Sequence, residues 1–384
     1  MTYRSNNNVS ADVFESLLDQ GLEAIPEILT MLLNQAMDIE RTKHLQALPY
    51  ERTADRKGYA NGYKPKQLNT RVGKLDLKIP QTRDSEFYPS CLERGMRSER
   101  ALKIAAAEMY FQGVSTRKVK AVMESLCGFD LTSTEVSQSA ALLDEEFKAW
   151  RERKLGKFVY VYLDAMYEKI RYGGCVQSCA VLLAIGVNEE GHREILGLSV
   201  ELSEHEVHWR KFLASLQERG LHGVRLFISD DHAGLKAARQ AIFPSIPWQR
   251  CQFHLQQNAQ SYVTKQSKRR EVASFIRAIL TAPTQEEAER LLNQTILLYE
   301  KEMPRLAEWM EKNILEGLTH LQFPEHHHRL IRTSNVLERL NREIRRRTKS
   351  IGVFPNTASC ERLISAVLIE TNDDWVSGKK YLTF

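Results

Sequence analysis

Several common features are missing from this sequence, and each absence narrows the class of protein. The longest nearly apolar run, residues 179–187, is about half of the ~20 residues that a membrane-spanning helix needs. The N-terminus has polar residues where a signal peptide has an apolar core. The six cysteines are scattered without close, regular spacing, which suits a reducing compartment better than a disulfide framework. We therefore expect a cytoplasmic protein with free thiols. No P-loop or dinucleotide-binding glycine pattern occurs either.

The composition is that of a folded protein whose charge is unevenly placed. At 384 residues, with 42% hydrophobic and 27% charged residues, the chain is long enough for two or three domains. The net charge is only +5, but residues 51–83 contain nine basic and three acidic residues, and residues 332–349 contain seven basic and two acidic residues. Such blocks are typical of polyanion-binding proteins, although solvated helix surfaces also produce them.

The first 150 residues predict helices interrupted by one hairpin. Apolar residues at helical spacing predict a short helix after Ser10 and a longer one over about 25–36. Alternating apolar residues after a turn at Gly73 predict a hairpin over 67–80 with a largely basic exposed face. Three helical stretches follow over 99–150, and the third begins at a capping-box pattern, Thr132 with Glu135.

This three-helix segment has two interpretations. Three short helices with a glycine-containing turn resemble a helix-turn-helix module, which places its last helix in the major groove of DNA. A plain three-helix bundle has the same periodicity. Under the first interpretation, four polar residues of the last helix would reach base edges: Ser133, Thr134, Ser137 and Gln138.

From residue 157 onward the pattern changes to segments rich in Val, Leu, Ile and Tyr, which predict strands. Four successive strands are predicted, over residues 158–163, 167–171, 178–187 and 193–200. They should pair antiparallel because no helix separates them. A helix, a strand over 224–229, a helix from Gly234 and a short strand around Trp248 follow. This order is that of the ribonuclease-H-like fold, an α/β class, and a helical segment from about residue 262 would be an insertion into it.

Two aspartates directly follow predicted strands, where the sites of α/β proteins are built. Asp164 follows the strand ending at residue 163, and Asp230 follows the strand ending at residue 229. A single aspartate in such a place more often caps the next turn. The adjacent Asp231 complicates the choice, because two consecutive side chains of an extended segment point in opposite directions.

Glu338 would complete a set of three carboxylates. It lies on a predicted helix and shares a face with Asn335, Arg342 and Arg345. Converging carboxylates about 4 Å apart would repel by roughly 4 kcal/mol per pair at an effective dielectric constant near 20, so bound cations would be needed. Two divalent ions can activate the attacking oxygen and stabilise the leaving one in a displacement at phosphorus.

Two histidine-containing segments have less specific interpretations. Cys251 and His254 have the spacing of two zinc ligands, but the remaining ligands would have to come from elsewhere, and a supporting role is the alternative. The three histidines His326, His327 and His328 follow a proline and predict a polar loop.

Motifs along nearly the whole chain resemble the Mutator-type family of bacterial insertion-sequence transposases. In chain order they are Asn61-Gly62-Tyr63, Thr70-Arg71-Val72-Gly73, Ser98-Glu99-Arg100-Ala101-Leu102, Gln112-Gly113-Val114-Ser115-Thr116-Arg117, Leu163-Asp164-Ala165, Ser229-Asp230-Asp231-His232, Trp248-Gln249-Arg250-Cys251 with His254, and Arg332-Thr333-Ser334-Asn335 followed by Glu338, Asn341 and Arg345. Carried over by position, Asp164, Asp230 and Glu338 resemble the family's DDE triad. Cys251 and His254 resemble its C-x2-H signature beside the active site.

The resemblance also bears on the second aspartate. Asp231 occupies a position that the family usually fills with a small residue, whereas the following His232 and Gly234 favour Asp230 as the metal ligand. His232, Cys251 and His254 are therefore expected to support the active site.

The resemblance further implies a reaction and its partners. A ribonuclease-H-like catalytic domain would hold Mg²⁺, with Mn²⁺ as a substitute and two ions in the site. It would hydrolyse DNA at the ends of the element and direct the freed 3′-hydroxyl to target DNA. N-terminal helices would recognise the terminal inverted repeats in double-stranded DNA. Because two ends must meet, a homo-oligomer, at least a dimer, is implied. The protein would act at the bacterial nucleoid.

These expectations define a domain plan and a second set of DNA contacts. The plan is residues 1–60 for oligomerisation or DNA binding, 61–155 for a basic hairpin and helix-turn-helix-like region, 156–261 for the first part of the catalytic domain, 262–328 for an all-helical insertion, and 329–384 for its last part with the glutamate helix. Beside Glu338, five residues are expected to contact DNA: Arg332, Asn335, Arg342, Arg345 and Arg346.

Two other functions remain compatible with the sequence. One is a catalytically inactive, sequence-specific DNA-binding protein that retains the carboxylates as remnants. The other is a ribonuclease-H-like metal nuclease that cuts DNA without joining strands. The intact triad argues against the first, and the N-terminal region with the helical insertion argues against the second, although similarity of fold alone does not decide function.

Overall fold

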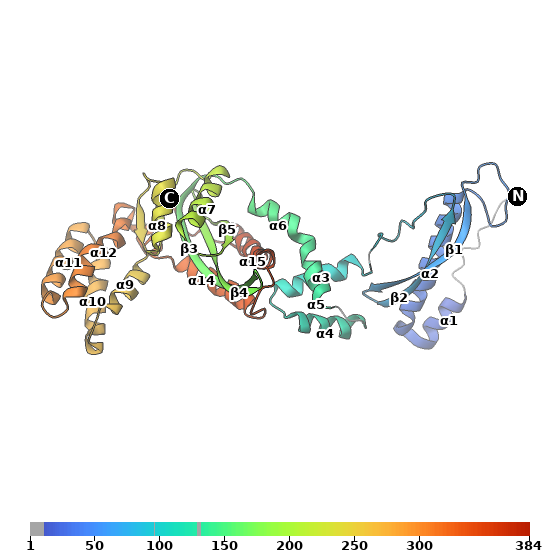
Figure 1. The fold of residues 1–384 in the computed structure, drawn as a ribbon, viewed down its shortest axis with the longest axis horizontal. Helices are drawn as coiled ribbons and strands as arrows, with labels where there is room; N and C mark the ends of the chain where they lie inside the picture. Colours follow the sequence, from blue (N-terminus) through green and yellow to red (C-terminus); the bar gives the residue numbers. More distant parts are fainter. Residues whose placement is uncertain (1–10, 96, 129–131) are drawn as a thin grey trace. The chain divides into compact units, whose positions relative to one another are not determined.

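The computed structural model describes residues 11–95, 97–128 and 132–384, apart from the side chains of residues 11–14, 133, 137 and 142. The chain divides into two compact units, Met1–Leu142 and Leu143–Phe384, whose elements are labelled in Figure 1. Each unit has hydrophobic clusters of its own. Within the described ranges, no helix combines the length and the apolar character needed to cross a membrane.

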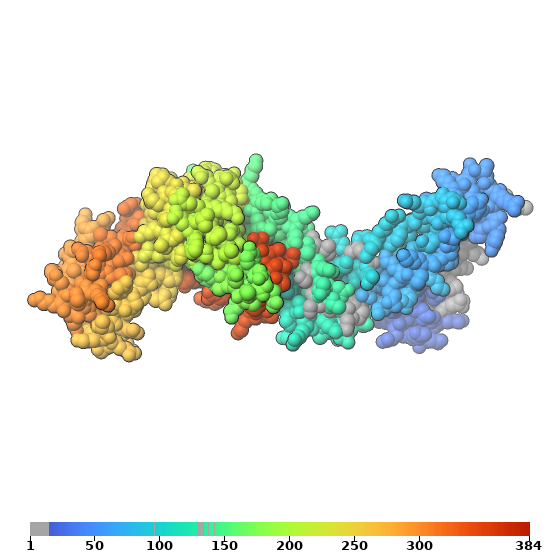
Figure 2. Space-filling view, in the orientation of Figure 1, coloured from blue at the N-terminus to red at the C-terminus, as the bar shows by residue number. Residues whose placement is uncertain are grey.

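The first unit begins with helices packed on a hairpin. Its first elements are α1 (Ala11–Gln20), η1 (Gly21–Ala24), α2 (Ile25–Leu45), β1 (Tyr59–Thr70) and β2 (Gly73–Arg83). The hairpin is longer than predicted, because β1 and β2 stay paired as far as Tyr59 opposite Arg83. The alternating residues Leu75 and Leu77 are buried against α2, where Met37 is also buried. Figure 2 shows this hairpin at the surface of the first unit.

Three short helices complete the first unit: α3 (Arg100–Phe111), α4 (Thr116–Cys127) and α5 (Ser133–Ala140). The capping box at the start of α5 is confirmed, since Glu135 donates its main-chain N–H to Thr132 Oγ1 (3.2 Å) and Thr132 N donates to Glu135 Oε2 (2.8 Å). The predicted extent of this last helix is wrong. The 3-10 turn η2 (Ala141–Leu143) follows it, and the next helix, α6 (Asp144–Arg151), belongs to the second unit.

The second unit is built on a mixed five-stranded sheet, which confirms the α/β class. Its strands are β3 (Phe158–Tyr172), β4 (Cys175–Asn188), β5 (Arg193–Glu201), β6 (Leu226–Ser229) and β7 (Trp248–Arg250). They lie in the order β5-β4-β3-β6-β7. As predicted, the first three pair antiparallel, while β6 and β7 add parallel to the other side of β3.

Helices cover both faces of this sheet. On one face, Val161 and Leu163 of β3 share a buried cluster with Trp209 of α7 (Glu206–Glu218) and Leu235 of α8 (Ala233–Ile242). The alternate residues of β3 face the other way, because successive strand side chains point to opposite faces. That second face is covered by α14 (Asn335–Thr348) and α15 (Thr357–Ser377), both of which contact β3.

A helical segment separates β7 from α14. It comprises α9 (Gln252–Ser261), η3 (Gln266–Lys268), α10 (Arg269–Leu280), α11 (Gln285–Tyr299), α12 (Pro304–Asn313), η4 (Ile314–Gly317), η5 (Thr319–Gln322) and α13 (Glu325–Ile331). Its first four α-helices share one buried core. The prediction of a loop at the three consecutive histidines is wrong, because they lie in α13, where His327 Nδ1 hydrogen-bonds the Tyr160 hydroxyl of β3 (2.8 Å).

Candidate active site

Asp164 lies inside a strand rather than after one. The predicted strands 158–163 and 167–171 are a single strand, because β3 keeps its pairing with β4 through Asp164 opposite Leu183. The predicted strand end at residue 163 is therefore wrong. Asp164 points to the face covered by α14, where its Oδ2 accepts a hydrogen bond from Asn341 Nδ2 (2.8 Å), while Oδ1 accepts one from the Ala165 main-chain N–H (2.9 Å).

Asp230 directly follows β6, as predicted. The parallel register pairs Tyr162 with Ile228, so its continuation by two residues sets Asp164 level with Asp230. Burial, and then the negative charge of Asp230, raise the pKa of Asp164 from 3.8 to about 7. The hydrogen bonds that Asp164 accepts and the nearby His254 act in the opposite direction. The carboxyl groups of Asp164 in β3 and of Asp230 just after β6 are therefore close enough for the charge of one to oppose ionisation of the other.

The adjacent Asp231 is engaged elsewhere. Its carboxylate lies 3.0 Å from the guanidinium of Arg250, whose side chain is only 1% exposed. Arg250 also pairs with Glu316 (3.0 Å) and donates to Asn313 Oδ1 (2.8 Å), two residues of the helical segment. Asp231 thus belongs to an ion network that joins the sheet to the helical segment. Asp230 is the member of the pair whose charge acts on the carboxyl group of β3.

Glu338 lies in the first turn of α14. Its Oε1 is 4.0 Å from Nε2 of His254, and this oxygen is buried without a hydrogen-bond partner among the described residues. One turn further along α14, Asn341 donates to Asp164. The helix that carries the glutamate is therefore tied directly to the strand that carries the first aspartate.

Cys251 and His254 lie at the start of α9, which follows the two aspartates and precedes Glu338 in the sequence. Burial would raise the pKa of the Cys251 thiol, but hydrogen bonds with His254 and Ser334 hold it below its ordinary value. The Ser334 main-chain N–H donates to Cys251 Sγ at 3.3 Å. The hydrogen bond with Cys251 raises the pKa of His254 to about 9 against the effect of burial, and the charges of the two aspartates raise it further. The supporting role predicted for both residues fits these contacts.

The same residues form a group with metal-ligand geometry. One ligand atom each from Cys251, His254 and Glu338 lies within 4.8 Å of the others. Within the described part of the chain, the oxygens of Asp164, Asp230 and Glu338 do not form an equally tight group. Oxygen ligands favour Mg²⁺, whereas thiolate and imidazole favour softer ions. Glu338 is thus the residue shared by the carboxylate set and the cysteine-histidine pair.

His232, two residues after Asp230, lies beside a fourth carboxyl group, that of Glu204. His232 caps the start of α8, and its Nδ1 lies 3.5 Å from Glu204 Oε2. Burial raises the pKa of Glu204, while His232 and a hydrogen bond with Tyr167 oppose this effect. The loop that carries Glu204 approaches α8 so closely that a Cβ on Gly234 would lie 2.4 Å from the Glu204 carbonyl oxygen.

The residues predicted to contact DNA through α14 lie around Glu338. Asn335, Arg342 and Arg345 are exposed, and Arg332, just before the helix, is partly buried. Arg346 is exposed but forms an ion pair (2.7 Å) with a glutamate of the same helix. Among the predicted DNA contacts, Arg342, Arg345 and Arg346 thus lie at the surface of this helix, where a polyanion can reach them.

The residues predicted to read bases through α5 belong to the first unit. Thr134 and Gln138 are exposed. The side chains of Ser133 and Ser137 lie outside the described residues.

Three contributors to the site carried no prediction of their own. Asn341 had a readable signal, because it lies three residues after Glu338 and hence on the same side of the helix. Arg250 belongs to the motif Trp248-Gln249-Arg250-Cys251, but nothing in the sequence indicated its contacts or those of Glu204, since their partners come from segments remote in the sequence.

Comparison with known proteins bears on the whole chain. The family model described as "Transposase, Mutator family" matches residues 3–378. The transposase of insertion sequence element IS406 from Burkholderia multivorans is 53% identical over the full length of both chains. That of ISRM5 from Rhizobium meliloti is 40% identical over 100% of this chain and 96% of its own, and that of IS256 in transposon Tn4001 from Staphylococcus aureus is 39% identical over 98% of each. The chain belongs to the Mutator family of transposases.

Proposed function

We propose that this transposase uses DDE chemistry: it binds the terminal inverted repeats of an insertion sequence and catalyses metal-dependent DNA cleavage and strand transfer. The observation that carries the proposal is the meeting of Asp164 and Asp230, which helps to raise the pKa of Asp164 to about 7. A protein gains nothing in stability from such a pair, so a function for it is the better explanation.

The residues present fit a divalent cation. Burial, and then the charge of Asp230, make Asp164 hard to ionise, and a bound cation would favour its ionised form. It would also give a partner to Glu338 Oε1, which is buried and has none in the described part of the chain. We propose that Asp164, Asp230 and Glu338 hold Mg²⁺, or Mn²⁺ in its place, as two ions. When bound, such ions would activate the attacking oxygen and stabilise the leaving oxygen at phosphorus.

The chain's own groups would prepare this site. Asn341 holds the Asp164 carboxylate in one orientation through its 2.8 Å hydrogen bond. His254, whose pKa is raised to about 9, would carry a positive charge near the aspartates at neutral pH. Arg342 and Arg345, exposed on the same helix as Glu338, would bind phosphates of the DNA strand and so hold it beside the carboxylates.

Three further features belong to the proposal. The catalytic unit would have the ribonuclease-H-like fold, which the element order and the strand order β5-β4-β3-β6-β7 support. The first unit, with its basic hairpin and exposed residues of α5, would bind the terminal repeats in double-stranded DNA. Pairing two ends would require at least a dimer, acting at the nucleoid.

The test is an end-cleavage and strand-joining assay. Purified full-length protein is incubated with labelled DNA carrying the element's own ends, with Mg²⁺ or with EDTA. The variants are Asp164→Asn, Asp230→Asn and Glu338→Gln, with Asp231→Asn as the matched control. We expect metal-dependent cleavage and joining that the first three variants abolish without loss of DNA binding. Asp231→Asn should retain both steps at a temperature where it stays folded.

Other outcomes would support other functions. Binding of the ends without cleavage under any divalent ion would support a binding-only protein. Cleavage without joining would support a metal nuclease. Cleavage that survives Asp230→Asn but not Asp231→Asn would show that the assignment of the second aspartate is wrong.

A further inference from the structure

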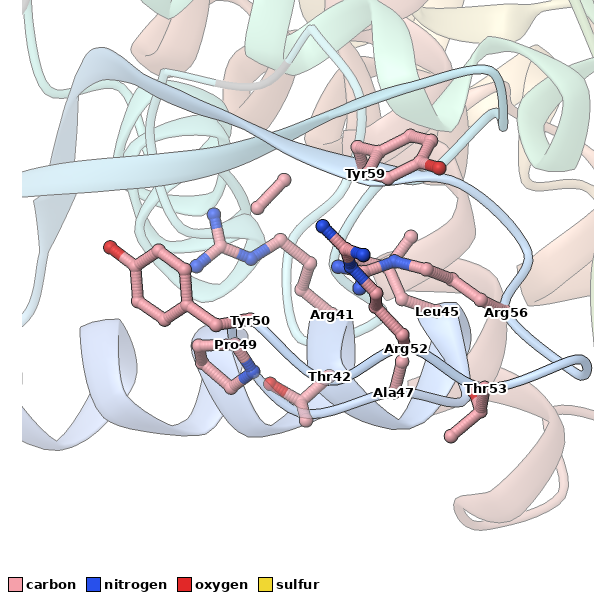
Figure 3. Close-up of a pocket in the computed structure, with 11 residues that line it drawn as sticks. Arg41, Thr42, Leu45, Ala47, Pro49, Tyr50, Arg52, Thr53, Arg56 and Tyr59 are labelled. Atoms are coloured by element: carbon pink, nitrogen blue, oxygen red, sulfur yellow. The ribbon is translucent and has the colours of Figure 1, made fainter.

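The first unit contains a pocket lined by arginines and tyrosines. It has a volume of about 1020 Å³ and lies between the end of α2, the connecting segment 46–58 and the start of β1. Figure 3 shows the side chains of Arg41, Arg52 and Arg56 directed into the space between Tyr50 and Tyr59. No residue of the candidate active site lines this pocket.

The positive charge of this pocket is largely uncompensated. Arg56 donates hydrogen bonds to the main-chain oxygens of Glu51 and Gly58, the second at 3.0 Å, so its guanidinium is held in place without losing its charge. Arg52 has no carboxylate partner within residues 11–95, 97–128 and 132–384. Of the three pocket arginines, Arg41 alone forms an ion pair within the described part of the chain, with Asp38 at 2.8 Å. Fixed, unpaired guanidinium groups are the donors that proteins use to bind phosphate.

The two tyrosines of the pocket expose their rings, which suits contact with a flat ring of a ligand. Tyr50 is fully exposed and has a backbone φ of +65°. For a bulky residue this left-handed conformation is strained, and such strain is common at binding sites. Tyr59 is 57% exposed and has the guanidinium of Arg56 over its ring, 4.8 Å from the centroid. An exposed aromatic ring beside a phosphate-binding arginine is the arrangement that stacks on nucleic-acid bases.

We propose that this pocket binds an unpaired nucleotide of the DNA substrate, with its phosphate against Arg52 and Arg56 and its base stacked on Tyr50. The inference rests on the proposed function, because that function makes DNA the ligand. A base in an intact duplex has both faces covered by its neighbours, so the ring of Tyr50 can stack only on an unpaired one. Arg52 and Arg56, which line the pocket, also belong to the basic segment 51–83, whose excess of positive charge favours a nucleic-acid ligand.

A binding comparison among three DNA probes tests this proposal. The probes share one sequence: a blunt duplex carrying the element's end, the same duplex with a short unpaired tail, and the single strand alone. Binding to full-length protein is measured by fluorescence anisotropy in EDTA, so that no cleavage occurs. The pocket variants are Tyr50→Ala, Tyr50→Phe and Arg52→Ala. Matched controls are Tyr172→Ala, a 49% exposed tyrosine of the second unit, and Arg290→Ala, an arginine of α11.

We expect the native chain to bind the tailed duplex more tightly than the blunt one. Tyr50→Ala should weaken binding of the tailed duplex about fivefold or more, the lower end of the contribution of base stacking, and leave the blunt duplex unaffected. Tyr50→Phe should behave like the native chain. The logarithm of the association constant falls linearly with the logarithm of the salt concentration. Arg52→Ala should make this dependence less steep for the tailed probe, by roughly 0.7 to 0.9 in slope, the value for one phosphate contact.

Equal losses for the blunt and tailed duplexes, losses no larger than those of the controls, or no binding of any probe would overturn the proposal. Asp164→Asn separates it from the proposed function, because this variant should keep the preference for the tail while losing cleavage. If neither the native protein nor any variant cleaves DNA but the preference for the tailed duplex persists, the result supports the nucleotide-binding pocket and contradicts the proposed DDE chemistry.

Discussion

Replacing Asp164 with asparagine should make the metal-free protein more stable near neutral pH, although it removes a carboxylate from the candidate active site. The reason is the pKa of Asp164, which burial and the charge of Asp230 raise from 3.8 to about 7 in the folded chain. Above this pKa the folded protein must carry a charge that it disfavours, whereas the unfolded chain carries the same charge in water.

The size and the pH range of the effect follow from this shift. One pKa unit corresponds to about 1.36 kcal/mol, so ionised Asp164 costs the folded state about 4 kcal/mol above pH 7. This cost is absent below about pH 4, where the carboxyl is protonated in both states, and stability is lost as the pH rises through 7. Asparagine removes the cost but weakens hydrogen bonds with Ala165 and Asn341 by about 1 kcal/mol. We expect a net gain of about 2 to 3 kcal/mol at about pH 8 and none at about pH 4.5.

The assay is equilibrium unfolding in urea with EDTA present, followed by tryptophan fluorescence. All five tryptophans lie between residues 150 and 375, so the signal reports the second unit. Asp231→Asn is the matched control, because it loses its ion pair with Arg250 and should be destabilised. If Asp164→Asn is no more stable than the native chain at about pH 8, or if its gain is the same at both pH values, the pKa of Asp164 is not raised in the folded protein.

Two further predictions use the same unfolding assay, and a third uses NMR. Arg250→Met should destabilise the second unit by about 1.5 to 3 kcal/mol, because it removes the buried guanidinium that bridges Asp231 and Glu316, two partly exposed carboxylates that keep Lys236 as a partner, whereas Lys312→Met, at an exposed ion pair, should change it by less than about 1 kcal/mol; equal effects would contradict this. Gly191→Ala should cost more than about 2 kcal/mol, since residue 191 has a φ of +89° and its added Cβ would lie 1.8 Å from a main-chain oxygen. Asn341→Ala should raise the pKa of Asp164 further, seen by carbon NMR of the carboxyl, and an unchanged pKa would show that their hydrogen bond does not form.

The sequence located most elements of the second unit because their side chains repeat at strand or helix spacing. Apolar runs predicted β4 and β5 closely, and Asp230 was correctly placed after β6. The length of β3 was not predictable in this way. Polar residues at and after Asp164 suggest a strand end, but pairing with β4, which lies elsewhere in the chain, extends the strand to Tyr172.

Contacts between remote segments account for the rest of what was missed. Asn341 and Asp164 are 177 residues apart, and no local pattern indicates their hydrogen bond. The helix α13 forms where the preceding proline suggested a loop, and its His327 hydrogen-bonds Tyr160 of β3, 167 residues earlier in the sequence. Likewise, the strained Tyr50 has no signature in the sequence, since backbone φ depends on how the connecting segment is anchored at both ends.

The ion network around Arg250 has a consequence for reading mutational data on this protein. Two consecutive aspartates perform separate tasks, since Asp231 holds the sheet to the helical segment while Asp230 lies beside Asp164. A genetic screen that scores only transposition in cells would count both positions as essential. A screen that also scores the amount of soluble protein would distinguish them: loss of Asp231 would lower protein abundance, whereas, under the proposed DDE chemistry, loss of Asp230 would leave abundant but inert protein.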